Sequence, residues 1–509
     1  MEYSVETLER DLKNTRKYYG SGKTKEAPWR ESQLKGLHNF IVEKEEEIVT
    51  ALKHDLGKHY VEAFRDELGT LMKTLNLATK SLKNWMAGKE AKLPRIALLS
   101  SAEIVPEPLG LVLIISSWNF PFGLSLEPLI GAVAAGNSVV LKPSELSPTC
   151  SSLLATFLPT YLDNNAIKVI QGGPEVGKLL LQQRWDKIFF TGSARVGRIV
   201  MSAAAVHLTP VTLELGGKCP ALIDSLSSSW DKEVAVKRIL VAKFGACAGQ
   251  ACIAIDYVLV EKSFSSTLVT LMKEWIKKMF GENPKASNSI ARIVNKNHFM
   301  RLQNLLTEPR VKESVVYGGS MDENDLFIEP TILLDPPLDS AVMAEEIFGP
   351  VLPIITSGNV AIEVLFVFSG LLQLEKIEDS VEFISSRPKA LAIYAFTKNQ
   401  TLQRRMVSET SSGSLVFNDA ILQRIPYHLE ELVNVGFGKY HGKFSFDAFS
   451  HHKAVARRSY LTDFWFRFPP WTLDKLQLLE VSYNLDYLGI LLVLLGLKKS
   501  KRSLFQACN

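Results

Sequence analysis

Between residues 110 and 205 the chain alternates short apolar runs rich in β-branched residues with segments typical of helices. One apolar run covers Leu111–Ile115 and another covers Ser138–Leu141, with the helix-like stretch Ile130–Ala135 between them. Parallel strands that are buried on both faces by crossover helices have this pattern. The alternation therefore predicts a parallel sheet with helices on both faces.

The same alternation continues toward residue 205. Strand-like composition returns at Val169–Gly173 and Lys187–Thr191, and helix-like stretches follow at Val176–Gln183 and Val196–Ala205. Residues 2–86 have apolar positions at helical spacing and predict amphipathic helices that cover the sheet. A second α/β domain is predicted from four further strand-like runs: Leu222–Asp224, Tyr257–Val260, Phe327–Leu333 and Ala392–Phe396.

Length, charge and cysteine content narrow the classes of function. A chain of 509 residues is longer than one hydrophobic core usually supports, so two or three domains are expected. A net charge of +4 gives no basic footprint for nucleic acid. Five cysteines without a CxxC pair fit neither a disulfide framework nor a zinc site, and no metal is predicted. Because the acidic N-terminus lacks the apolar segment of a signal peptide, the expectation is a cytoplasmic protein that acts on small molecules.

Cys252 is the residue that most directly suggests a catalytic function. It stands in the run Gly245–Ala254, where small residues leave backbone N–H groups close to the thiol. A thiolate nucleophile needs such donors and a lowered pKa. A lone cysteine is more often a small core residue, so both interpretations stay open at this point.

Three polar side chains stand near other expected strand ends or turns. Glu214 lies in an apolar run, where burial would raise its pKa and suit a general base, or it is a charge at a strand edge. Asn119 follows the run at 111–115, so its amide reaches a cleft at the carboxyl end of the strand or caps a turn. Glu346 precedes a turn and belongs either to a site or to a solvated loop.

Residues after two expected strands suggest a nucleotide site. Lys142 and Glu145 follow the run at 138–141 and can hydrogen-bond ribose hydroxyls. Gly192 and Ser193 follow the run at 187–191 and lead into a helix, whose N-terminal N–H groups attract phosphate. Tight packing of a strand on a helix explains this glycine equally well, because the motif is not GxGxxG.

Five segments resemble motifs of the aldehyde dehydrogenase family and occur in the family's order. They are Trp118–Phe122, Phe190–Ser193, Leu213–Lys218, Gly249–Cys252 and Glu345–Pro350. Cys252–Tyr257 and Lys439–Asp447 are further similar to family 3, particularly to its plant members. The resemblance covers residues 5–356 and 375–509, and therefore most of the chain.

The resemblance implies an α/β chain with the aldehyde dehydrogenase-like fold. This fold combines a Rossmann-type NAD(P)-binding domain, an α/β catalytic domain and a β-rich oligomerisation arm. A homodimer is expected through β-rich segments near Ile104 and Ser414–Asn418. The expected boundaries are 1–215 for the NAD(P)-binding domain, with part of the arm near 87–108, then 216–420 for the catalytic domain, 421–455 for an oligomerisation or bridging segment and 456–509 for a C-terminal tail.

The resemblance also implies a reaction. Family members oxidise medium- and long-chain aliphatic or aromatic aldehydes, including products of lipid peroxidation, to carboxylic acids through a cysteine thiohemiacetal and thioester. Cys252 would be the nucleophile, and Asn119 would hold the oxyanion together with the Cys252 N–H. Glu214 would be the base, with Glu346 as an alternative. The cofactor would be NAD, with NADP as the second choice, because a carboxylate at Glu145 repels a 2′-phosphate. The implied cofactor-binding positions are Lys142, Glu145, Gly192, Ser193, Glu346 and Phe348.

Two segments depart from the family and support a second hypothesis. About eighteen residues from Ser357 to Leu374 have no counterpart, and we interpret them as a retained intron or as a membrane-contacting hairpin. At His428–Asn434 the family has Pro-Phe-Gly-Gly-Val-Gly-Glu, which codons for the present residues can encode in the neighbouring frame, as after a local frameshift. If both changes are real, the chain would be a catalytically impaired, membrane-associated structural or cofactor-binding protein.

The C-terminal tail suggests contact with a membrane or with a partner. Leu488–Leu497 is almost wholly apolar and is followed by basic residues within 498–502. A helix of this length covers about half of a roughly 30 Å hydrocarbon core, so residues 488–502 are expected to anchor at an anionic surface rather than to span it. Packing of this tail on a partner subunit is the alternative of equal weight.

Overall fold

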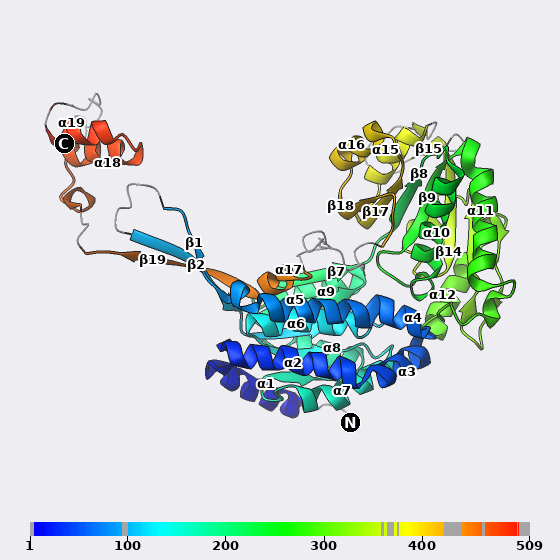
Figure 1. Cartoon of the computed structure of the whole chain (residues 1–509), viewed down its shortest axis with the longest axis horizontal. Coiled ribbons are helices and arrows are strands. Elements are labelled where there is room, and N and C mark those ends of the chain that lie inside the picture. Colours follow the sequence, from blue (N-terminus) through cyan, green and yellow to red (C-terminus); the bar gives the residue numbers. More distant parts are fainter. Residues whose placement is uncertain are drawn as a thin grey trace. The chain divides into compact units, whose positions relative to one another are not determined.

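The computed structural model describes residues 5–93, 100–357, 361–363, 371–373, 376–421, 440–460, 464–495 and 497. The chain divides into two compact units. The larger comprises Met1–Lys83 and Pro108–Ser450, and the smaller comprises Asn84–Glu107 and His451–Asn509. The larger unit holds two main sheets with their helices (Figure 1). The predicted domain boundaries remain predictions.

The first sheet has five parallel strands in the order β5-β4-β3-β6-β7. Val112 of β3 pairs with Val139 of β4 and with Lys187 of β6, so the chain winds outward from β3 in both directions. This arrangement confirms the parallel sheet predicted from the alternating sequence. The strands are β3 (Leu111–Ile115), β4 (Ser138–Lys142), β5 (Ile167–Val169), β6 (Lys187–Gly192) and β7 (Val211–Leu215).

The strand predicted at Val169–Gly173 was placed too late in the chain. The observed strand, β5, ends at Val169. Gly172 has φ of 150°, and a Cβ at this position would lie 2.3 Å from Val176. Three residues after the end of β5, the backbone therefore turns toward the next helix through a conformation that favours glycine. It then enters α8 (Pro174–Leu181), which begins with a proline in the first turn.

Helices cover both faces of the first sheet (Figure 1). Leu8 and Leu12 of α1 share one buried cluster with Val140 and Leu180, so α1 packs on the sheet together with α8. Elsewhere in this unit, helix α2 packs against helices α6 and α7. The amphipathic helices predicted for the N-terminal residues are confirmed. They are α1 (Val5–Gly20), α2 (Ala27–Glu43), α3 (Glu45–Leu56), α4 (Tyr60–Ala63) with a π-helical turn at Phe64–Leu68, and α5 (Gly69–Met86), followed later by α6 (Gly123–Ala135), α7 (Pro148–Tyr161) and α9 (Ala194–Ala205).

The second sheet has seven strands in the order β10-β13-β14-β9-β8-β17-β18. All neighbours are parallel except β10, which pairs antiparallel with β13. Two of the predicted strands lie within β9 and β17, and the prediction Leu222–Asp224 overlaps the end of β8 at residues 222 and 223. The strands are β8 (Cys219–Ile223), β9 (Ile255–Glu261), β10 (Val315–Tyr317), β13 (Thr331–Leu334), β14 (Val351–Ser357), β17 (Ala390–Phe396) and β18 (Ser412–Phe417).

The fourth predicted strand, Phe327–Leu333, is split in two at Pro330. A proline cannot donate to the ladder of a sheet. β12 (Phe327–Ile328) pairs with β11 (Met321–Asp322), whereas β13 joins the second sheet. The helices around this sheet are α10 (Ser229–Phe244), α11 (Lys262–Phe280), α12 (Lys296–Thr307), α13 (Pro309–Lys312), α14 (Ala341–Ala344), α15 (Ser380–Ser385) and α16 (Gln400–Glu409).

The smaller unit contains a three-stranded sheet in the order β1-β2-β19. Glu103 of β2 forms an ion pair with Arg457 of β19 at 2.5 Å. Ile104, which the predicted dimer contact includes, is 41% exposed. A β-rich arm is therefore present. Its strands are β1 (Lys89–Glu90), β2 (Ser100–Pro108) and β19 (Ser450–Arg458).

The C-terminal tail forms two helices, α18 (Leu473–Tyr483) and α19 (Tyr487–Leu494). Leu488, Leu491 and Leu494 of α19 are each more than half exposed. Over the described part of the chain, no helix is both long enough and apolar enough to cross a membrane. The basic residues at 498–502 lie outside the described residues, so the surface anchor stays a prediction.

The two segments that depart from the family are only partly described. The insertion begins where β14 ends, and within it β15 (Ala361–Glu363) pairs antiparallel with β16 (Leu371–Gln373). The altered segment His428–Asn434 lies outside the described residues. The interpretations of both segments stay predictions.

Candidate active site

The loop between α10 and β9 carries Cys252 on a tightly wound backbone. Cys247 and Ala248 both have φ of 50°, a left-handed conformation that residues with a Cβ seldom adopt. Gly249 has φ of 78°, and a Cβ there would lie 2.4 Å from the carbonyl oxygen of Gly349. Strained backbone of this kind persists only where surrounding contacts hold it, and it concentrates at functional sites.

Among the described cysteines, Cys252 has the access that a nucleophile needs. It is partly exposed, whereas Cys150, Cys219 and Cys247 are buried. Burial also raises the pKa of the Cys219 thiol well above its ordinary value. Because the thiolate is the reactive form, buried thiols of this kind are poor nucleophiles. The geometry therefore favours the catalytic interpretation of Cys252 over that of a core residue.

Cys252 and Glu214 line the same cavity. Its volume is about 90 Å³, and most of its wall is apolar, with contributions from Phe120, Leu124 and Leu391. Ligand pockets commonly combine an apolar wall with a few convergent polar groups. The cavity therefore suits a molecule with one reactive polar group on an aliphatic or aromatic body.

Glu214 brings a carboxyl group with spare hydrogen-bonding capacity to this cavity. It lies in β7, and only 6% of the residue is exposed. Burial raises the pKa of its carboxyl well above the ordinary value. Its Oε1 atom has no hydrogen-bond partner within the described part of the chain. A carboxylate with a raised pKa and a free acceptor can take a proton from water, as a general base does.

Asn119 is not one of the described residues that line the cavity, and it lies next to the cysteine loop. Its side-chain Nδ2 donates to the carbonyl oxygen of Gln250 at 2.9 Å, two residues before Cys252. An amide nitrogen carries two hydrogens, so this bond uses one of its two donors. The residue is only 2% exposed, and its neighbour Phe120 lines the cavity.

The Glu346 carboxyl group lies against the glycine pair that follows β7. A Cβ at Gly216 would lie 2.2 Å from Glu346 Oε2, so this close approach requires glycine. The backbone N–H of Gly217 hydrogen-bonds the same carboxyl group. Burial, and to a lesser extent the charge of Asp256, raise the pKa of Glu346 to about 8. The structure thus places the two candidate bases, Glu346 and Glu214, at one strand end.

Phe348, two residues after Glu346, is the other cofactor position predicted from this loop. It adopts φ of 51°, which is uncommon for a residue with an aromatic side chain. Its ring packs edge-on against Trp118, with 5.5 Å between the ring centroids. Trp118 immediately precedes Asn119, so the loop of Phe348 meets the loop of the amide.

Four of the predicted nucleotide residues lie at the carboxyl ends of β4 and β6, the two strands on either side of β3. Lys142 ends β4 and its Nζ lies 2.9 Å from Glu145 Oε2. Gly192 ends β6, and Ser193 caps α9 with its Oγ accepting the Val196 N–H at 3.4 Å. Because β4 and β6 flank β3, these residues border the crevice where open α/β sheets bind nucleotides. The residues present therefore fit a dinucleotide.

Sequence reasoning missed several polar residues of the cavity wall, among them Asp66, Glu127 and His441. Nδ1 of His441 lies 3.0 Å from Oε1 of Glu127, across 314 positions of sequence. No periodicity relates residues so far apart. His441 does stand within Lys439–Asp447, the segment similar to family 3, and that resemblance is the signal that could have found it.

Comparison with known proteins agrees with this geometry. The chain matches the aldehyde dehydrogenase family over residues 2–455. Aldehyde dehydrogenase family 3 member F1 of Arabidopsis thaliana is 50% identical over 504 residues, which cover 98% of this chain and 100% of the relative. Family 3 member H1 of the same plant is 47% identical, with 95% and 96% covered.

Solved structures extend the likeness to three dimensions. The substrate-bound AldH of Staphylococcus aureus is 38% identical and superposes with a TM-score of 0.83, over 91% of this chain and 96% of that one. The family match at residues 2–455 spans both main sheets and the loops that carry the site. The chain therefore belongs to the aldehyde dehydrogenase family, and its relatives place it in family 3.

Proposed function

We propose that this chain oxidises medium- and long-chain aliphatic or aromatic aldehydes to carboxylic acids with NAD or NADP, using Cys252 as the nucleophile. The observation that carries the proposal is the shared cavity, in which a partly exposed thiol and a buried carboxyl of raised pKa meet an apolar wall. Aldehyde dehydrogenases act on aldehydes with NAD or NADP, and the apolar wall accounts for a preference for hydrophobic ones.

The first half of the reaction takes place on the thiol. The Cys252 thiolate attacks the carbonyl carbon, and the carbonyl oxygen becomes an oxyanion. The Asn119 amide and the Cys252 backbone N–H donate hydrogen bonds to this oxyanion. They stabilise a negative charge that develops only during the reaction. When the carbon gives up hydride, the oxyanion collapses and a thioester remains on Cys252.

The second half releases the product. Glu214 accepts a proton from a water molecule, whose oxygen attacks the thioester carbon. The thiolate of Cys252 leaves, and the carboxylic acid departs. Glu346 is the alternative base, because its carboxyl is buried at the same strand end with a pKa raised to about 8. Among the described residues, Oε1 of Glu214 has no hydrogen-bond partner, and this favours Glu214 for the step.

Six residues would hold the cofactor, which supplies the acceptor for the hydride when bound. Lys142 and Glu145 would bind the adenosine ribose, and the α9 N-terminus the pyrophosphate. We propose that NAD is preferred, because the Glu145 carboxylate accepts a hydrogen bond from a 2′-hydroxyl and repels a 2′-phosphate. The full set is Lys142, Glu145, Gly192, Ser193, Glu346 and Phe348.

Replacing Glu145 by Gln is expected to shift cofactor choice toward NADP. Glu145 is partly exposed and pairs with Lys142, so its removal leaves a cation that can bind a 2′-phosphate. We expect the ratio of kcat/KM for NAD to that for NADP to fall about tenfold, which corresponds to about 1.4 kcal/mol. Steady-state kinetics with both cofactors measure this ratio, and an unchanged ratio would contradict the role of Glu145.

Assembly and location are further parts of the proposal. A homodimer through the β-rich arm is supported by the paired strands of that arm and by the exposure of Ile104. Peripheral membrane contact is supported by the exposed leucines of α19. We place the protein in the cytoplasm, with residues 488–502 as its membrane contact.

The decisive experiment is turnover by the purified full chain. Hexanal or nonanal is mixed with NAD or NADP, and the absorbance of reduced cofactor is followed. Formation of reduced cofactor together with the matching acid is expected. The second hypothesis, a catalytically impaired protein, would require cofactor binding without turnover.

A further inference from the structure

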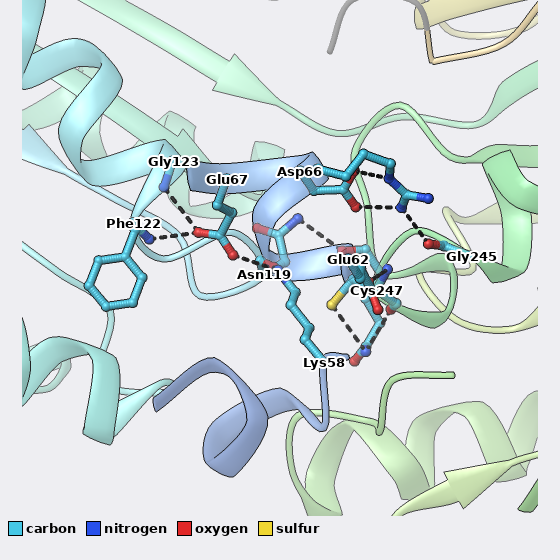
Figure 2. A network of polar contacts seen from close by, with 11 residues as sticks. Lys58, Glu62, Asp66, Glu67, Asn119, Phe122, Gly123, Gly245 and Cys247 are labelled. Carbon is cyan, nitrogen blue, oxygen red and sulfur yellow. Dashed lines mark hydrogen bonds and ion pairs between the residues drawn. The ribbon is translucent and has the colours of Figure 1, made fainter. Parts of the chain in front are cut away.

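One short segment, residues 58–68, contacts both loops that carry the proposed catalytic donors (Figure 2). The segment contains α4 and the π-helical turn Phe64–Leu68. Single π-helical turns within helices are uncommon and occur frequently at functional sites. No residue of this segment takes part in the proposed reaction, although Asp66 lines the cavity and Lys58 contacts Asn119.

A buried ion pair in this segment holds the Asn119 loop at two points. Lys58 Nζ lies 2.7 Å from Glu67 Oε1, and both side chains are fully buried. The same Nζ donates to the carbonyl oxygen of Asn119 at 2.8 Å. Glu67 Oε2 accepts the backbone N–H groups of Phe122 at 2.9 Å and Gly123 at 3.0 Å. The loop is thereby fixed at the backbone carbonyl of Asn119 and at the start of α6.

The same segment also holds the cysteine loop. Glu62 Oε1 accepts the backbone N–H of Cys247 at 2.7 Å. The Asn119 side chain in turn donates to the Gln250 carbonyl oxygen at 2.9 Å, which joins the two loops directly. The position of the amide relative to the thiol therefore depends on residues of this one segment.

Structural stability alone is a weak explanation for this ion pair. Removing two charges from water is costly, and apolar side chains of similar size often serve the fold equally well. What apolar side chains cannot do is accept two N–H groups and donate to a carbonyl oxygen in fixed directions. The pair is therefore better explained by the loop that it orients.

We propose that Lys58 and Glu67 are positioning residues that aim the Asn119 amide at the oxyanion. The inference rests on the proposed function, because it requires that Asn119 stabilise an oxyanion. Neither residue touches the substrate, and both act through Asn119. A catalytic donor must be held close to its productive geometry by surrounding contacts, and these two side chains supply them.

The test uses Glu67→Gln, which keeps an acceptor for the N–H groups but removes the charge that holds Lys58. We expect kcat for aldehyde oxidation to fall about 10–100-fold, with KM for the aldehyde changed less than about threefold. The rate at which iodoacetamide alkylates Cys252 should stay at the wild-type value. In that reaction a carbon–sulfur bond forms and iodide leaves, so no oxyanion arises.

A double mutant shows whether the effect passes through Asn119. Asn119→Ala should lower kcat by about 10²–10³-fold, as for loss of one oxyanion donor. If Glu67 acts through the amide, Glu67→Gln combined with Asn119→Ala should be no slower than Asn119→Ala alone. Multiplied losses, or a matching fall in the alkylation rate, would overturn the proposal in favour of a purely structural pair.

Asp55→Asn is the matched control, because Asp55 is a buried carboxylate that accepts the N–H groups of Thr149 and Cys150 at the start of α7. It should leave kcat unchanged. If Glu67→Gln does not fold, the charge-free variant Lys58→Met with Glu67→Gln replaces it, and the same pattern is expected. Absence of turnover in the wild-type protein would instead reject the proposed function, so the two failures are distinguishable.

Discussion

Replacing Cys252 by Ser is expected to lower kcat for aldehyde oxidation by about 10⁴-fold or more. A serine hydroxyl is much less acidic than a thiol, so almost none of it is ionised at neutral pH. No thiohemiacetal or thioester can then form, and no hydride is released. The measurement is the formation of reduced cofactor with nonanal, in steady state and in a single turnover. Cofactor binding should be unchanged, because the substitution lies outside the proposed cofactor residues.

Cys150→Ser is the matched control for this variant. Cys150 lies in α7, is buried and does not line the cavity. The control should retain wild-type kcat. Appreciable turnover by the Cys252 variant, or loss of turnover in the control, would show that the nucleophile has been assigned to the wrong residue.

Replacing Glu214 by Gln is expected to stall the enzyme as a thioester. Glutamine has nearly the shape of glutamate but cannot accept a proton, so the first half of the reaction survives and the hydrolysis slows. We expect a burst of about one equivalent of reduced cofactor per site, followed by turnover about 10²–10⁴-fold slower than wild type. Rapid-mixing absorbance measures the burst, and mass spectrometry of the quenched protein detects the acyl group on Cys252.

The pH dependence of this pair tests the base assignment independently. Burial raises the pKa of Glu214, so the wild-type kcat should rise with pH until the carboxyl is ionised, whereas the variant should lack this rise. If Glu346 is the base, Glu346→Gln removes the rise and Glu214→Gln does not. A burst absent from both variants would contradict the two-step reaction.

The same raised pKa predicts how Glu214 affects stability. The folded protein binds this proton more tightly than the unfolded chain, whose carboxyl ionises near the ordinary value of 4.5. Stability from this group is therefore full below that value and is lost as the pH rises toward the folded pKa. The melting temperature of Glu214→Gln, relative to that of the wild-type protein, should accordingly increase as the pH rises.

The fold could be predicted from the sequence where local pattern dominates. Buried parallel strands such as β3 and β6 are continuous apolar runs, and they were located almost to the residue. The errors in the predicted strands arose where a strand end depends on local detail rather than on the apolar pattern. Pro330 splits an apparent strand, and β5 ends at Val169 although the apolar pattern continues to Ile170.

The candidate site was predictable only in part. Cys252 and Glu214 stand in distinctive local sequences, and the structure brings them to one cavity. The Lys58–Glu67 pair could not be predicted, because a lysine and a glutamate in a helical region are usually solvated charges. Only the three-dimensional packing shows that both are fully buried. The roles of the individual site residues remain predictions until the variants are measured.

The contact between His441 and Glu127 has a consequence for the synthesis of the chain. The first sheet is complete once Leu215 has left the ribosome, but the cavity wall closes only when His441 follows. At about 5–20 residues per second, this interval lasts roughly 10–45 s. During that time the part of the apolar wall that is already made, including Phe120 and Leu124, is open to solvent and to other nascent chains. Partly folded chains with exposed apolar surface are prone to aggregate, so the growing polypeptide carries this risk until His441 is translated.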